Sequence, residues 1–242
     1  MQASPMGMMG YDRAITIFSP DGRLLQVEYA RKTISKGTTA IGIACNEGVI
    51  IIATKRVMEK LLVSESIKKI TKIDDNIGVT MSGLISDGRV LIERAQNIVH
   101  SYKLTYDETI DLLSLVREIS DYKQMFTQWG GARPFGVSLM LCGIDELGPH
   151  IFITEPSGIY FEYEAVSIGE NSAVVNKHLE KYYKKDMPIE KGIMMGISAL
   201  KKAVTKEEFD EEFLEVAVIP SKTKKFEKID KEKIKKYIKQ SE

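Results

Sequence analysis

The sequence predicts an α+β fold, a four-layer αββα sandwich of two stacked antiparallel sheets flanked by helix pairs, with an extra N-terminal helix. Apolar, β-rich runs come in pairs joined by short turns, and such turns make neighbouring strands antiparallel. Two pairs of amphipathic helical segments separate the groups of strands. The strand runs are apolar on both faces, which indicates sheets that are covered on both sides.

Length and composition favour one domain spanning residues 1–242. The chain has 242 residues, 43% of them hydrophobic and 28% charged, which is enough for one sizeable core. The net charge is zero, with 34 basic and 34 acidic residues, so we expect no nucleic-acid partner and no membrane partner. Cys45 and Cys142 lie in apolar runs and are expected to be buried free thiols, as in a reducing compartment. Without a signal peptide or a long apolar run, the protein is expected to be soluble and cytoplasmic.

The start of the chain divides into a tail and a helical segment. Residues 1–10 are rich in Met and Gly without periodicity, which is typical of a mobile tail. Ala14–Phe18 alternates and is expected to be extended. Ser19 is the expected N-cap and Pro20 the first helical residue of a helix that ends near Gly37. This segment, residues 11–37, precedes the sandwich of residues 38–242.

The remaining elements follow from hydrophobic periodicity and turn residues. Strands are expected at 38–44, 49–55, 66–73, 77–82, 135–143, 150–154, 159–167 and 213–219. Helices are expected at 84–102, 107–128, 172–184, 188–204 and 230–239. Thr105 to Glu108 resembles a capping box for the second of these helices.

A search for chemistry predicts no cofactor and no metal. The three histidines, His100, His150 and His178, are scattered over different elements, whereas metal ligands usually cluster. The chain has neither a phosphate-binding G-x-x-x-x-G-K-[ST] loop nor a G-x-S-x-G nucleophile elbow. Its basic stretch at 222–239 has few interleaved aromatic residues, so a docked helix is favoured over a nucleic-acid patch.

One stretch carries a specific resemblance. The string YDRAITIFSPDGRLLQVEYA, Tyr11 to Ala30, resembles the signature of proteasome α-type subunits. The similarity to archaeal α subunits extends to the last helix. Supporting strings are KGTTAIGI (36–43), SIKKI (66–70), MSGLISDGRVL (81–91), TQWGGARPFGVSL (127–139) and EPSG (155–158). The resemblance implies the Ntn-hydrolase fold of proteasome subunits, which agrees with the predicted sandwich.

The resemblance also implies a place in a larger particle. Seven α subunits of this family form a ring that caps each end of a barrel, with proteolytic β subunits inside. The implied role is a noncatalytic subunit of the 20S core particle that supports β-ring assembly and gates the passage of unfolded protein substrates. An AAA ATPase of the proteasome-activating nucleotidase type is the implied activator.

Particular residues acquire roles by the same resemblance. Residues 1–10 would obstruct the axial pore. The positions matching the cluster that holds the gate open are Tyr11, Asp12, Pro20 and Tyr29. The loop that narrows the pore below the gate would contain Trp129, Gly130 and Gly131.

Lys69 would bind the C-terminal carboxylate of the activating ATPase, in a pocket lined by Gly37 and Leu84. An ammonium and backbone N–H groups suit a carboxylate ligand. Alternation along the strand leaves the environment of Lys69 open, and a surface lysine on an edge strand is the other interpretation.

The alternative function is a β-like threonine peptidase that cuts itself between Gly37 and Thr38. The freed Thr38 would use its hydroxyl as nucleophile and its own amine as base, aided by Lys69. Against this, Lys55, or by strict count Thr54, stands where an acidic partner for that lysine is expected. Cutting at Thr38 would also discard the Tyr11–Ala30 signature, so the peptidase and the signature exclude each other.

Overall fold

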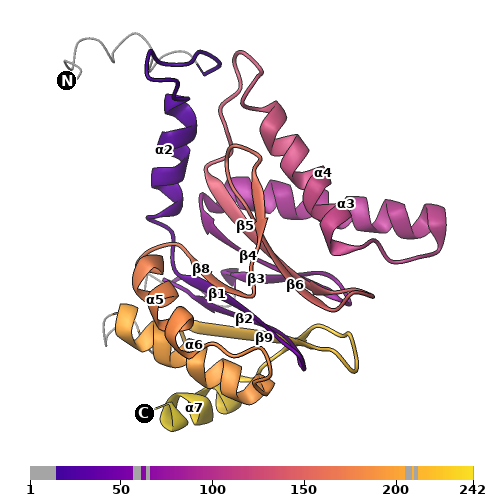
Figure 1. Ribbon diagram of the computed structural model, residues 1–242, viewed down its shortest axis with the longest axis vertical. Helices are drawn as coiled ribbons and strands as arrows, with labels where there is room; N and C mark the ends of the chain where they lie inside the picture. The colour runs from indigo at the N-terminus through magenta and orange to yellow at the C-terminus, as the bar shows by residue number, and fades with distance from the viewer. Residues whose placement is uncertain (1–14, 57–60, 64–65, 205–208, 210–211, 242) are drawn as a thin grey trace.

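Two five-stranded antiparallel sheets stack face to face, with helices on the outer face of each. The computed structural model describes residues 15–56, 61–63, 66–204, 209 and 212–241. In Figure 1 the two sheets lie between the helix pair α3 and α4 on one side and the helices α5, α6 and α7 on the other. The predicted αββα sandwich is confirmed.

The first sheet has the strand order β10-β9-β2-β1-β8. Its strands are β1 (Ala40–Cys45), β2 (Gly48–Thr54), β8 (Ala165–Ile168), β9 (Leu214–Pro220) and β10 (Glu227–Lys228). Helices α5 (Ser172–Tyr182) and α6 (Ile189–Ala203) pack against its outer face, and α7 (Lys231–Gln240) packs against α6.

The second sheet has the order β3-β4-β5-β6-β7. Its strands are β3 (Ile70–Asp74), β4 (Ile77–Gly83), β5 (Val137–Ile144), β6 (Pro149–Thr154) and β7 (Tyr160–Glu162). Helices α3 (Ile85–Tyr106) and α4 (Leu112–Met125) cover it.

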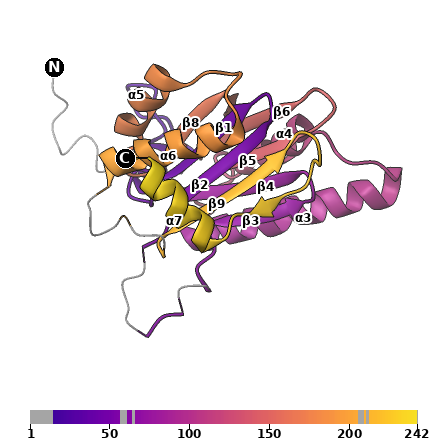
Figure 2. The ribbon, with the colours of Figure 1, turned by 90° about the horizontal axis from the view of Figure 1, so that it is seen from below.

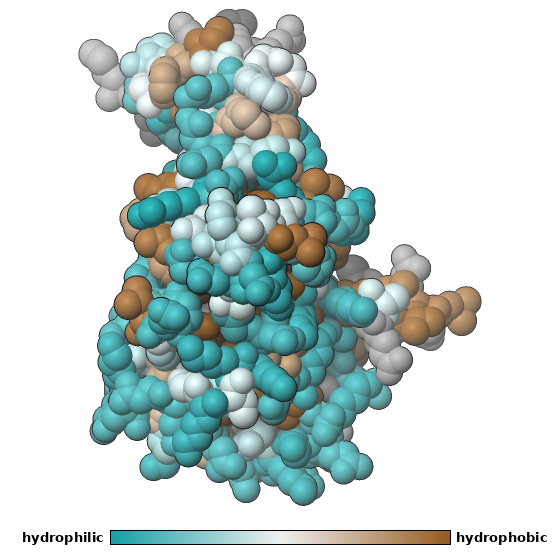
Figure 3. Space-filling view, turned by 90° about the vertical axis from the view of Figure 1, so that its right-hand side faces the viewer, coloured by the Kyte–Doolittle hydropathy of each residue, from teal (hydrophilic) through white to brown (hydrophobic). Residues whose placement is uncertain are grey.

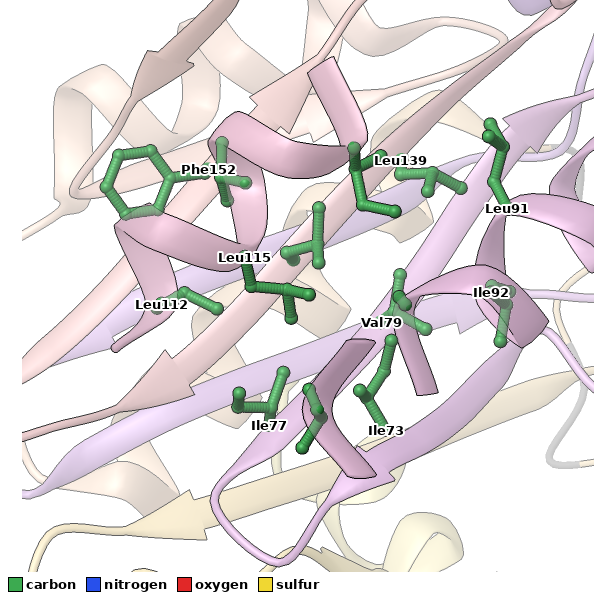
Figure 4. Close-up of a cluster of buried hydrophobic side chains, with 14 of the residues drawn as sticks. Ile73, Ile77, Val79, Leu91, Ile92, Leu112, Leu115, Leu139 and Phe152 are labelled. Carbon is green, nitrogen blue, oxygen red and sulfur yellow. The ribbon is translucent and has the colours of Figure 1, made fainter. Parts of the chain in front are cut away.

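Alternation along the strands divides the core into three layers. On β2, Ile50 and Ile52 face the helices α5 and α6, whereas Val49 and Ile51 face the other sheet. The layer between the second sheet and its helices is built mainly from Leu, Ile and Val side chains of β3, β4, β5, α3 and α4, with Phe152 from β6 (Figure 4). Both faces of β1, β2 and β5 are therefore buried, which explains why these strands read as continuous apolar runs.

Helix α2 (Leu25–Ile34) extends away from the sandwich (Figure 1), and only one of its faces is buried against the rest of the chain. Its buried residues are Leu25, Val27 and Ala30, and it packs on β4 and β5. The opposite end of the molecule, seen in Figure 2, carries α5, α6 and α7 over the first sheet. The body is mainly hydrophilic on the face shown in Figure 3, and its projecting upper end mixes hydrophilic and hydrophobic residues. Ile17 and Phe18, ahead of α2, are 53% and 62% exposed.

The start of α2 differs from the prediction. Ser19 does not cap the helix, because residues 19–22 form a turn in which the Gly22 N–H donates to the Ser19 carbonyl. Gly22 has φ of +72°, a left-handed conformation that interrupts the helix before it begins at Leu25. The predicted extension at Ala14–Phe18 is also wrong for its described part, since residues 15–18 form a bend and an irregular segment rather than a strand.

Two further boundaries were predicted wrongly. Asp107 lies in a left-handed conformation, with φ of 56°, and ends α3 there, so Thr105 to Glu108 is not a capping box. Asp111 caps α4 instead, accepting a hydrogen bond from the Ser114 N–H at 2.8 Å. The single strand expected at 159–167 is two strands, β7 and β8, which belong to different sheets.

No helix in the described part of the chain is long and apolar enough to cross a membrane. Within the same residues, no three His, Cys, Asp or Glu side chains come together as a potential metal site.

Candidate functional site

The predicted pocket residues meet at the corner where β4 ends and α3 begins, residues 81–87. Lys69 immediately precedes β3, and its Nζ donates a hydrogen bond to the carbonyl of Met81 at 3.0 Å. Gly37 lies against the same corner: a Cβ at Gly37 would come within 2.3 Å of Ser82 Oγ and 2.4 Å of the Gly83 nitrogen. Leu84 follows at once, 41% exposed. The corner therefore carries one buried cation, a tight glycine contact and an exposed apolar side chain.

Lys69 is not the surface lysine that the alternative interpretation expected. Only 5% of it is exposed. Burial lowers the pKa of Lys69 to about 8, and the nearby carboxylate of Glu215 opposes that shift. The amine is thus mostly charged at neutral pH. An ammonium has three N–H donors, and the Met81 carbonyl accepts one of them.

Glu215 on β9 supplies a negative charge near Lys69. In the sequence, no acidic residue occupies the position where a partner for this lysine was expected. The Oε1 atom of Glu215 lies 2.6 Å from Lys55 Nζ, and its Oε2 accepts a hydrogen bond from the Ile70 N–H at 2.9 Å. It therefore holds the backbone next to Lys69 and lies near two cations, the buried Lys69 and the partly buried Lys55. The sequence signal was present, since Glu215 is the one charged residue within the apolar strand LEVAVIP.

The loop between α4 and β5, which contains Trp129, Gly130 and Gly131, forms a turn closed by a hydrogen bond from the Ala132 N–H to the Trp129 carbonyl. Trp129 is 55% exposed, and a Cβ on either glycine would meet open space. The ring of Trp129 lies against Phe126, with ring centroids 5.9 Å apart. The resemblance predicts that this segment narrows a pore, and the name pore loop is used below only as its label.

The pore loop is tied to the β4–α3 corner by an ion pair that sequence reasoning missed. Arg133 makes two contacts with the carboxylate of Asp87, at 2.6 and 2.7 Å. These contacts hold the pKa of Asp87 below its usual value. Nothing in the local sequence pairs a residue of α3 with one 46 positions later, so only the folded chain reveals it.

Half of the predicted gate cluster can be located. Tyr11 and Asp12 lie outside the described residues. Pro20 is exposed at the tip of the 19–22 turn, and an ion pair between Arg23 and Glu28 joins that turn to α2. Tyr29 lies on α2, with Lys32 Nζ 5.3 Å from its ring centroid.

Thr38 lies two residues before β1, in the segment that joins α2 to the first sheet. Its Oγ1 is buried and has no hydrogen-bond partner among the described residues. The neighbouring backbone is fixed, since the Glu170 N–H donates to the Gly37 carbonyl and Thr39 Oγ1 donates to the Glu170 carbonyl. In this arrangement the nitrogen of Thr38 is an amide, which cannot serve as a base.

An αββα sandwich of this topology, with a helix ahead of the threonines that precede the first strand, defines the class of the protein, which is the Ntn-hydrolase fold. The sequence model of the family described as proteasome subunit matches residues 34–219. A second model, which describes the N-terminal signature of A-type proteasome subunits, matches residues 11–32.

Curated archaeal relatives named as proteasome alpha subunits agree with this assignment. The chain is 46% identical over 232 residues to the one from Methanosarcina thermophila, covering 96% of this chain and 94% of the relative. It is 48% identical over 228 residues to the one from Methanocaldococcus jannaschii, covering 94% and 87%. It is 47% identical over 232 residues to the one from Thermococcus sibiricus, covering 96% and 88%.

The chain belongs to the proteasome subunit family. Within that family it is an α-type member of the 20S core particle, which assembles with other subunits and does not itself carry the peptidase activity. The threonine peptidase alternative at Thr38 is therefore set aside.

Proposed function

We propose that this protein forms a seven-membered ring that caps β rings, gates the axial pore and docks the C-termini of an activating ATPase. The observation that carries this proposal is the match of residues 11–32 to the N-terminal signature of A-type proteasome subunits, a segment that includes most of α2. Its helix α2 buries only one face on its own chain. The apolar side chains of Ile17 and Phe18 remain exposed beside it, and exposed apolar groups of this kind are typical of surfaces that meet a partner.

The pore assignment rests on two segments. Residues 1–10 would obstruct the axial pore, and the turn at 19–22 with Tyr29 would belong to the support of the gate together with Tyr11 and Asp12. The pore loop of Trp129, Gly130 and Gly131 would narrow the passage below it. The space around Gly130 and Gly131 is open. This suits a loop that lines a pore through which an unfolded substrate chain moves.

The docking assignment rests on the β4–α3 corner. A C-terminal carboxylate of an AAA ATPase would pair with Lys69, beside Gly37 and the exposed side chain of Leu84. A buried ammonium binds a carboxylate more strongly than an exposed one, because water does not screen the pair. The cytoplasm is the expected compartment, since such ATPases consume ATP there.

Negative-stain electron microscopy tests the assembly. We expect the purified protein, expressed with its β partner, to give barrel-shaped particles whose end views have sevenfold symmetry. A monomer of about 27.2 kDa on sizing, with no ring in the micrographs, would contradict the proposal.

Docking is expected to weaken as the pH rises through about 8. Burial sets the pKa of Lys69 at about 8, so above that pH the amine is neutral in the free protein. It must then take up a proton before pairing with a carboxylate, and affinity falls by about tenfold per pH unit. Fluorescence anisotropy of a labelled ATPase C-terminal octapeptide between pH 7 and 9.5 measures this.

Lys68→Ala is the matched control, because Lys68 is the exposed neighbour and its removal should leave the pH trend intact. A constant affinity across this range in the wild-type protein would show that Lys69 does not supply the charge.

A further inference from the structure

The β4–α3 corner and the pore loop contact each other through Gly136, just before β5. The Leu84 N–H donates to the Gly136 carbonyl at 2.9 Å. The Gly136 N–H in turn donates to Asp87 Oδ2, also at 2.9 Å. A Cβ on Gly136 would lie 2.9 Å from Leu84 Cδ1, and one on Gly83 would lie 2.2 Å from the Gly136 carbonyl oxygen. This spacing leaves no room for the corner to move independently of Gly136.

Arg133 extends this contact into the pore loop. Its guanidinium binds the Asp87 carboxylate with both terminal nitrogens, and Nη1 also donates to the Pro134 carbonyl at 3.1 Å. The Asp87 side chain is 9% exposed, whereas that of Arg133 is 57% exposed. One buried carboxylate therefore receives three hydrogen bonds from residues 133–136, and a bidentate pair of this kind fixes orientation as well as distance.

The other end of the pore loop is held by aromatic packing rather than by charge. Phe126 lies 4.7 Å from Phe135 and 5.0 Å from Tyr122, measured between ring centroids. This packing positions the end of α4 and, through Phe135, joins it to the chain just before Gly136. Between the two supports, Gly131 has φ of +87° and marks the bend of the loop.

We propose that Asp87 and Arg133 form a positioning clamp that makes the activator pocket and the pore loop move as one body. Displacement of Leu84 by a docked carboxyl terminus is transmitted through Gly136 and the clamp to Trp129. The transmission step rests on the proposed docking function, whereas the clamp itself does not.

Trp129 gives a direct readout, because it is the single tryptophan of the chain. We expect Arg133→Gln and Asp87→Asn to raise acrylamide quenching of Trp129 by about 1.5-fold, since the side chain is already 55% exposed. Arg133→Lys, which keeps one charged contact, should restore part of the wild-type value. Arg89→Gln is the matched control: it breaks the exposed Arg89–Glu93 pair on the same helix and should leave quenching unchanged.

Thermal melting separates the clamp from general destabilisation. Arg133→Gln leaves the buried Asp87 carboxylate without its cation and is expected to melt below the wild type, whereas Asp87→Asn removes the charge itself and should melt closer to the wild type while its quenching still rises. Quenching equal to that of Arg89→Gln in both clamp variants would overturn the clamp.

A second arm tests transmission with a labelled ATPase C-terminal octapeptide and its C-terminal amide. We expect the free-carboxylate peptide to shift Trp129 emission in the wild type, and to bind Arg133→Gln with similar affinity but without the shift. An equal shift in Arg133→Gln would overturn transmission. If neither peptide binds the wild type, the docking proposal fails, and quenching still decides whether the clamp exists.

Discussion

Replacing Lys69 by alanine is expected to abolish ATPase-stimulated protein degradation and to leave basal peptide hydrolysis unchanged. Lys69 is the buried cation of the β4–α3 corner, and among the described residues its Nζ has a single hydrogen-bond acceptor, the Met81 carbonyl. Removing one partner of a buried charge pair costs about 2 kcal/mol or more, a loss in affinity of at least roughly 30-fold. Basal hydrolysis depends on the β subunits and on the gate rather than on this pocket. The measurement is degradation of an unfolded protein with and without the ATPase.

Two companion variants make the result specific. Lys69→Met keeps most of the buried volume and should lose stimulation as fully as alanine, which excludes a cavity as the cause. Lys68→Ala removes an exposed lysine one position away and should behave as wild type. Normal stimulation in Lys69→Met would show that the carboxylate docks elsewhere.

Deleting residues 2–10 is expected to raise basal hydrolysis of small peptides by reconstituted particles. A gate that is open in about 10% of particles limits peptide access, so removing the obstruction should increase the rate by up to about tenfold. The tail is rich in Met and Gly, with little to bury, so it is suited to block by occupying space. A fluorogenic peptide assay at subsaturating substrate measures the change.

The informative control restores the length of the tail but not its amino-acid sequence. A Gly/Ser segment of the same length in place of residues 2–10 should return hydrolysis toward the wild-type rate, because obstruction by a flexible chain depends on length. If the deletion leaves the rate unchanged, the tail is not the gate.

Much of the fold could be predicted from hydrophobic periodicity and turn residues. The errors of this prediction have local physical causes. Strands β1 and β2 were located closely because a continuous apolar run and a short turn define them. The helix start at Ser19 was misplaced because Ser-Pro-Asp-Gly fits both a cap and a turn, and the left-handed Gly22 decides for the turn. Likewise the capping box predicted at Thr105 to Glu108 was wrong because Asp107 adopts a left-handed conformation that ends α3, and Asp111 caps α4 instead.

The residues of the site could be predicted from the sequence, but their burial and their charged neighbours could not. Resemblance identified Lys69, Gly37 and Leu84, and the chain does bring them to one corner. Lys69 is buried and lies near Glu215 because β3 contacts β9. These two elements are far apart in the sequence. The Asp87–Arg133 clamp was missed for the same reason, as was Lys123, a fully buried lysine whose Nζ is satisfied by oxygens of β5 and β6.

The central claim is that the leader, residues 11–37, stays attached ahead of Thr38, so that this protein admits substrates and does not cleave them. Intact mass spectrometry of the chain taken from assembled, active particles tests this most directly. The account predicts a chain that retains residues 11–37. A mature chain that begins at Thr38 would contradict it.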